Sequence, residues 1–316
     1  MQRKKNIRLL IIFVVLIMIN ATVILLDNGQ AQQNIDRYKF TMIDTSQVNK
    51  ITLEQSGEEL VFQKLDNKWQ INQKYPMDER MAGLIFAVMT SVETSRAAGG
   101  PGNGGIADRL LKDGVLVKFY NGKNAISTFY VGGNATRTTS YMMKTTESVP
   151  YAVYIPGYTS YLAGLFELKV SDWRNKKAFE TSWSSLKSLK LEAVKDQRVQ
   201  LEIAYKDNFF KVASVKEVDT VKMMDYLEKT TNLLIDQYIA SGEFPSYDSL
   251  GLAQPEFTLI VEDADATKNR KLLIYPQIGK DNQRLGKLLP SEQMVIIRQR
   301  KVETILASNS DFQAGN

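Results

Sequence analysis

An uncharged and mostly aliphatic stretch, Leu9 to Leu26, constrains this chain more than any other feature of its sequence. At about 1.5 Å of rise per residue, a helix of this length is roughly 27 Å long, close to the thickness of the hydrocarbon core of a bilayer. A basic tip precedes it and contains Arg3, Lys4, Lys5 and Arg8. We therefore predict one N-terminal transmembrane helix, with the bilayer as its partner.

Charge sets the predicted orientation, because basic residues that flank a first span remain in the cytoplasm. The chain has 40 basic and 35 acidic residues, a net charge of +5, and removing the four basic residues of the tip leaves 36 − 35 = +1. Most of the excess of basic residues thus lies in the N-terminal tip, where it serves membrane targeting, and it gives no argument for nucleic-acid binding. We predict a single-pass protein of the inner (cytoplasmic) membrane, with a cytoplasmic N-terminus and its bulk periplasmic or extracellular.

A removable signal peptide is the alternative interpretation of the same stretch. Gly29 and Ala31 are small residues at the two positions that a signal peptidase reads. Typical signal cores have only about 7 to 15 residues, which favours retention as an anchor. Asn20 lies within the predicted span, where it could bond a second helix or be a tolerated polar residue near the outer end. It is the first candidate interaction residue.

Composition removes most catalytic chemistry, because the 316 residues include no cysteine and no histidine. Thiol catalysis, Ser-His systems and the usual zinc sites are thereby excluded. We predict no enzymatic activity, no catalytic residue, no cofactor and no metal site. One remote alternative is a Ser-Lys hydrolase, because Ser184 and Lys187 would lie one turn apart on a helix.

Hydrophobic patterning predicts an α+β fold. From Val48 to Ile71, apolar residues alternate in three short strands separated by Ser56-Gly57 and Asp66-Asn67, which favour turns. After Asp78, a candidate N-cap, apolar residues recur at helical spacing. The second half repeats this order, with Asp219 before its helix. We therefore predict that the transmembrane helix is followed by two similar units, each made of antiparallel strands packed with an amphipathic helix.

The predicted division of the chain follows from these patterns. It comprises a basic tip and anchor (1–27), a stalk (28–46), a first α+β unit (47–167), a connector (168–185), a second α+β unit (186–308) and a tail (309–316). Gly99 to Gly105 holds five glycines but lacks the Gly-Lys-Ser/Thr ending of a phosphate-binding loop. We interpret it as a loop.

Two further places could contact a partner or ligand. In the connector, Trp173 and Arg174 are residue types enriched at binding hot spots, although Trp173 could instead pack between the two units. Tyr158 and Tyr161 belong to a cluster with Tyr151 and Tyr154 that could line a cleft or serve ordinary packing. Besides Asn20 in the predicted span, the candidate interaction residues are therefore Trp173, Arg174, Tyr158 and Tyr161.

Several short motifs resemble those of a family of uncharacterised bacterial exported domains, a domain of unknown function with tandem α+β units. They are the segment from Asp44 to Leu53, the segment from Lys68 to Asn72, Pro76 with the Asp-headed helix, and the connector motif Asp172-Trp173-Arg174. The resemblance covers roughly residues 38–307. Members of that family are often found beside gliding-motility-type ABC transporter subunits. It therefore implies an integral-membrane transporter or motility subunit as partner, and it supplies no catalytic residues.

Together these features predict a non-enzymatic, membrane-anchored extracytoplasmic accessory or scaffold subunit of an envelope ABC transporter or gliding-motility-type complex. The alternative is an extracytoplasmic ligand-binding module for a glycan, peptide or lipid. The Ser-Lys hydrolase is the remote third possibility.

Overall fold

The computed structural model describes residues 16–18, 35–98, 105–194, 200–240, 242–277 and 282–315. The chain divides into two compact units. The first contains residues 1–61 and 83–167, and the second contains residues 62–82 and 168–316. Residues 62–82 thus group with the second unit, although they come early in the sequence.

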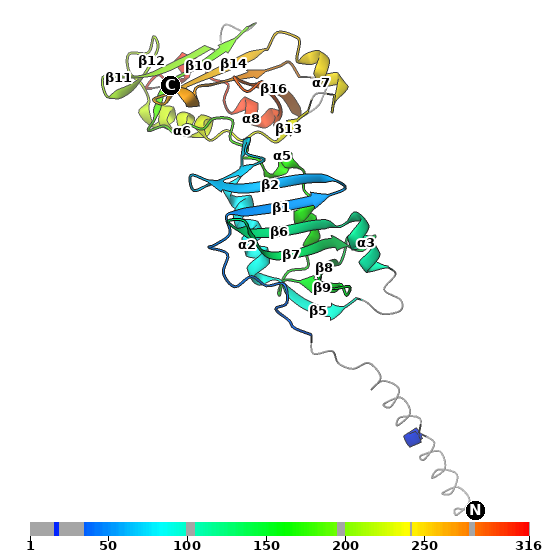
Figure 1. Cartoon of the computed structure of the whole chain (residues 1–316). Coiled ribbons are helices and arrows are strands. Elements are labelled where there is room, and N and C mark those ends of the chain that lie inside the picture. The colour runs from blue at the N-terminus through cyan, green and yellow to red at the C-terminus, as the bar shows by residue number, and fades with distance from the viewer. Residues whose placement is uncertain are drawn as a thin grey trace, which may run out of the picture. The chain divides into compact units, whose positions relative to one another are not determined.

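The first sheet is antiparallel and has nine strands in the order β4-β3-β2-β1-β6-β7-β8-β9-β5. In Figure 1, β2, β1, β6 and β7 run side by side. Alternation builds these strands, since every second residue of β6 is buried. The strands are β1 (Lys50–Gln55), β2 (Glu58–Leu65), β3 (Lys68–Ile71), β4 (Tyr75–Pro76), β5 (Glu93–Ala97), β6 (Val115–Asn121), β7 (Asn124–Gly133), β8 (Ser140–Lys144) and β9 (Tyr151–Tyr154).

Helices accompany this sheet: α2 (Glu79–Ser91), α3 (Ile106–Asp113) and α4 (Ala163–Phe166). Ile85 and Met89, one turn apart on α2, are completely buried, so this face of the helix enters the core. Phe129 on β7 is the centre of an aromatic group. Its ring lies 6.0 to 6.4 Å from three others, those of Phe40, Phe119 and Phe166.

The second sheet has eight strands in the order β12-β11-β10-β14-β15-β16-β17-β13. They are β10 (Leu186–Ala193), β11 (Gln200–Lys206), β12 (Phe209–Val212), β13 (Gln237–Ile239), β14 (Phe257–Asp263), β15 (Arg270–Ile274), β16 (Gln283–Leu289) and β17 (Gln293–Arg298). The helices are α5 (Val170–Trp173), α6 (Thr220–Thr231), α7 (Pro245–Leu250) and α8 (Gln299–Glu303), with 3-10 turns η1 (Ala266–Lys268) and η2 (Asn309–Phe312).

Helix α6 supplies one wall of the core of the second unit. Asp219 caps its N-terminus, because its carboxylate accepts a hydrogen bond of 3.0 Å from the Lys222 amide. Met223 and Leu227, one turn apart, belong to one buried cluster with the inward residues of β10, β11 and β14, which include Leu189, Leu201 and Leu259. An amphipathic helix thus covers the apolar face of an antiparallel sheet.

The two sheets repeat one strand order. From β3 to β5 the first reads β3-β2-β1-β6-β7-β8-β9-β5, and the second reads β12-β11-β10-β14-β15-β16-β17-β13, so only β4 has no counterpart. Each long helix also begins with the same contact. The Asp78 amide donates to the Trp173 carbonyl at 2.9 Å, and the Asp219 amide donates to the Phe312 carbonyl at 2.8 Å. In both places a buried aromatic residue lies at the start of the Asp-headed helix.

The predicted α+β class is corrected by the structure, which is mostly sheet, with 40% strand and 23% helix. Most helices other than α2 and α6 have at most eight residues, so the sheets build the bulk of the fold. Helix α4 has only the four residues Ala163–Phe166, and α8 has only the five residues Gln299–Glu303. The physical reason is that two large sheets, each with one long helix, already bury the apolar residues.

The predicted transmembrane helix is not supported either. No helix in the described ranges is long and apolar enough to cross a membrane. Of the stretch Leu9 to Leu26, only Leu16–Met18 is described, as helix, and the remainder, including Asn20, lies outside the described residues.

The partly buried carboxylate of Asp236, just before β13, bonds residues at and beyond the end of β17. We predict that this contact makes the stability of the fold sensitive to acid. The Asp236 carboxylate accepts bonds of 2.7 Å from Arg298 Nε, 2.8 Å from the Arg298 amide and 2.9 Å from Lys301 Nζ. Burial alone would raise the pKa of Asp236, but the bonds from Lys301 and Arg298 outweigh burial, so its pKa is lowered. The bonds therefore stabilise the fold fully above the ordinary aspartate pKa of about 3.9 and are lost as pH falls through the lower folded value.

We expect Asp236→Asn to be less stable than wild type at neutral pH and to lose less stability as the pH falls below the ordinary aspartate pKa of about 3.9. Urea unfolding at a series of pH values measures both effects. Equal acid sensitivity of the two proteins would contradict this assignment.

Candidate functional site

Trp173, a predicted interaction residue, is completely buried. Its ring lies 4.9 Å from that of Phe62, and its Nε1 donates to the Leu168 carbonyl at 3.3 Å. All these contacts lie within the second unit. Trp173 therefore serves the core and offers no surface to a partner.

Arg174, the next residue, is 9% exposed and lies between two aromatic rings. The carbon of its guanidinium is 3.9 Å from the Tyr75 ring centroid and 3.4 Å from that of Tyr238. Nη1 donates to Gln293 Oε1 at 2.6 Å, whereas Nε is buried without an acceptor. Burial lowers the pKa of Arg174. The two π faces compensate a buried positive charge, as cation–π contacts do in desolvated places.

A polar cleft of about 310 Å³ lies in the first unit, where the end of α3 meets the end of β7. Tyr161, another predicted interaction residue, lines it and donates to Glu167 Oε1 at 2.6 Å. Burial raises the pKa of Tyr161, and the bond to Glu167 and its charge raise it further. Arg137 Nη2 lies 3.4 Å from Glu167 Oε2. Arg109, on α3, also lines the cleft.

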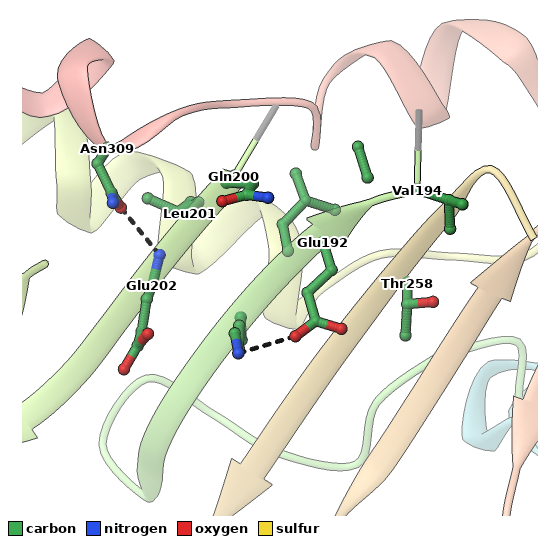
Figure 2. A pocket seen from close by; sticks show the side chains of 10 residues that line it. Glu192, Val194, Gln200, Leu201, Glu202, Thr258 and Asn309 are labelled. Atoms are coloured by element: carbon green, nitrogen blue, oxygen red, sulfur yellow. Dashed lines mark hydrogen bonds and ion pairs between the residues drawn. The ribbon is translucent and has the colours of Figure 1, made fainter. Parts of the chain in front are cut away.

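A second cleft, of about 390 Å³, lies on β10, β11 and β14 of the second unit, beside η2 (Figure 2). Two of its charged side chains pair with each other, since Lys190 Nζ lies 2.8 Å from Glu192 Oε1. Asn309 Oδ1 accepts a bond of 2.9 Å from the Glu202 amide and so ties η2 to β11. This cleft is therefore organised by internal contacts of the second unit.

The remaining predicted residues do not gather into one site. Tyr158 is 69% exposed and does not line either cleft. Tyr154 donates to Glu93 at 2.8 Å, and the Tyr151 ring contacts Phe40 at 6.2 Å. Of the four clustered tyrosines, Tyr161 lines the first cleft, and the other three line neither of these two clefts. Their close spacing in sequence reflects ordinary strand and turn packing.

The Ser-Lys hypothesis loses its geometric basis. Ser184 lies in a turn and Lys187 in strand β10, so the two are not one helical turn apart. The Ser184 hydroxyl is hydrogen-bonded to that of Ser182 at 2.8 Å. The carboxylate of Asp263 is buried and accepts bonds from the Thr181 and Ser185 hydroxyls. Within the described ranges, no group of three acidic side chains is placed to hold a metal ion.

Sequence patterns missed the charged residues of the first cleft. Arg109 and Asp113 are separated by one helical turn of α3, and Glu167 ends the segment after α4. The one available signal was the pair Gly132-Gly133 at the end of a strand, where glycine marks a close approach of other atoms. The glycine-rich loop is described only at Gly105, because 99–104 lie outside the described residues.

Comparison with known proteins gives one match. A family model described as a domain of unknown function (DUF4340) matches residues 101–255, just under half of the 316 residues. No curated protein and no solved structure matches this chain. The matched range holds most of the first cleft, including Arg109, Gly132 and Glu167. The central part of this chain is therefore similar to a domain of unknown function (DUF4340).

Proposed function

We propose that this chain is a non-enzymatic, extracytoplasmic accessory or scaffold subunit of an envelope ABC transporter or gliding-motility-type complex, attached to the membrane through Leu9 to Leu26. The observation that carries the proposal is the side-chain chemistry of the chain. It has neither cysteine nor histidine, and its one nucleophile–base spacing, Ser184 and Lys187, is divided between a turn and a strand. Such a chain is better suited to contact than to catalysis.

Two further observations support this proposal. The basic tip before an uncharged stretch favours a location at the cytoplasmic membrane with the bulk outside. Two large sheets with one strand order provide extended surfaces of fixed geometry. The transporter or motility partner comes from the family resemblance of the sequence motifs alone.

Photo-crosslinking in the native envelope tests the proposal. A photoreactive amino acid replaces Tyr158, Phe209 or Leu252, which are 69%, 71% and 90% exposed, in the full chain. We expect at least one position to give a covalent adduct with an integral-membrane transporter or motility subunit, identified by mass spectrometry. Protease added outside intact spheroplasts should digest the protein while a cytoplasmic marker survives.

Two outcomes would contradict the proposal. One is full protection of the chain from external protease. The other is the absence of adducts with membrane subunits from all three positions. In that case, a reaction of the same positions with an added control peptide shows that the photoreactive groups are active. The alternative, an extracytoplasmic ligand-binding module, is favoured by one observation, the polar cleft of the first unit.

A further inference from the structure

The cleft of the first unit corresponds to a filled place in the second. The strand pairing of the two sheets shows which residues are equivalent, because β6 and β7 hold the places in the first sheet that β14 and β15 hold in the second. Val115, the first residue of β6, pairs with Val131 of β7, and Phe257, the first residue of β14, pairs with Ile274 of β15. The residue after Val131 is Gly132, and the residue after Ile274 is Tyr275. By the same register, Gly114 corresponds to Glu256.

In the second unit these positions carry large side chains that fill the space. Tyr275 is 3% exposed, and its hydroxyl donates to the Gly251 carbonyl at 3.1 Å. Glu256 forms an ion pair with the buried Arg284. In the first unit, Gly114 and Gly132 line the cleft of about 310 Å³ instead. One copy of a repeated architecture is thus closed by packing and the other is open.

Glycine shapes the floor of this open copy. A Cβ atom at Gly132 would lie 2.9 Å from Leu110 Cδ2, and one at Gly133 would overlap the Tyr161 ring. Real Cβ atoms do not approach so closely, so any side chain here would displace Leu110 or Tyr161. The cleft and its tyrosine therefore depend on both glycines.

The cleft is lined by equal numbers of positive and negative side chains, and only some of them form ion pairs with each other. Arg137 and Glu167 form one ion pair at 3.4 Å, with the Arg137 side chain 74% exposed. Arg109 and Asp113 line the same cleft from α3, and among the described residues neither forms an ion pair. Two guanidinium groups and two carboxylates thus surround one space whose lining is electrically neutral.

We propose that this cleft binds a small zwitterionic ligand of the class of amino acids and short peptides with free termini. Arg109 and Arg137 would receive the ligand carboxylate, since guanidinium groups match carboxylates in planar two-bond geometry. Asp113 and Glu167 would accept from the ligand ammonium group. A volume near 300 Å³ is at the small end of ligand clefts and suits a ligand of this size. This inference is independent of the accessory role proposed above.

Nuclear magnetic resonance titration of the full chain with dialanine tests the proposal. We expect saturable shifts of the Gly132 and Gly133 amide signals, within reach of about 10 mM ligand. The N-acetylated and C-amidated forms of dialanine should each bind at least about tenfold more weakly, because each lacks one charged end. Equal binding of the blocked forms, equally tight binding of inorganic phosphate, or no shift at either glycine would overturn the proposal.

A pair of variants on one helix separates this site from general charge effects. Arg109→Gln should weaken dialanine binding about tenfold or more. Lys112→Gln removes the same charge from α3, but its side chain does not line the cleft, so it should bind as wild type does. Circular dichroism confirms that both variants are folded. Equal affinity of the two variants would overturn the assignment of Arg109.

Discussion

Replacing Trp173 by alanine should lower the free energy of unfolding by about 3–5 kcal/mol. The side chain is completely buried, packs on Phe62 at 4.9 Å and lies beside the start of the Asp-headed helix, whose first amide bonds the Trp173 carbonyl. Alanine would leave a large cavity there, and the surrounding strands can relax only in part. Urea unfolding followed by circular dichroism measures the loss.

Two variants make this prediction specific. Trp173→Phe should restore most of the stability, because a phenylalanine, Phe312, stands in the same relation to the other helix-capping aspartate, Asp219. Trp183→Ala removes the same residue type from a place that is 52% exposed and should cost much less. If Trp173→Ala and Trp183→Ala cost equal amounts, Trp173 does not hold the place in the core that its contacts indicate.

Replacing Glu256 by glutamine should destabilise the second unit by about 3 kcal/mol. Arg284, its partner, is 5% exposed and also donates to the Tyr275 carbonyl at 2.9 Å. Without the carboxylate, a buried guanidinium keeps its charge with no counter-charge, which is costly. The estimate lies at the lower end of the usual range because the Glu256 side chain is 34% exposed.

The double variant Glu256→Gln, Arg284→Met distinguishes the loss of a pair from the burial of a lone charge. It should be more stable than Glu256→Gln alone, since apolar replacement of a buried pair is often close to neutral. Asp225→Asn, which removes the exposed pair with Lys229, should change stability little. A double variant less stable than the single one would show that the lone charge is not the source of the loss.

Local signals in the sequence predicted many elements correctly. The strands between Val48 and Ile71 and the two Asp-headed helices are where alternation, turn pairs and capping residues indicated. These signals act between residues close in sequence, so they can be read without knowing the fold. Strand β5, Glu93–Ala97, was missed because its residues do not alternate clearly between apolar and polar. It forms because β9 offers an unpaired edge.

The candidate sites were much less predictable. Trp173 and Arg174 were identified as a connector motif, but their burial depends on Phe62, Tyr75 and Tyr238, which lie far away in sequence. The same holds for the first cleft, where Arg109, Arg137 and Glu167 meet only after β7 has paired with its neighbours. None of them shares a motif with the others.

By itself, the sequence determined the side-chain chemistry, without cysteine or histidine, and the short-range pattern of strands, turns and capped helices. Only the tertiary structure decided that sheet predominates, that Arg174 lies between two tyrosine rings, and that glycine leaves one copy of a repeated architecture open where Tyr275 closes the other. The physical reason is the distance along the sequence over which each kind of interaction acts. Propensity and periodicity act within a few residues, whereas burial and charge pairing depend on segments that strand pairing brings together.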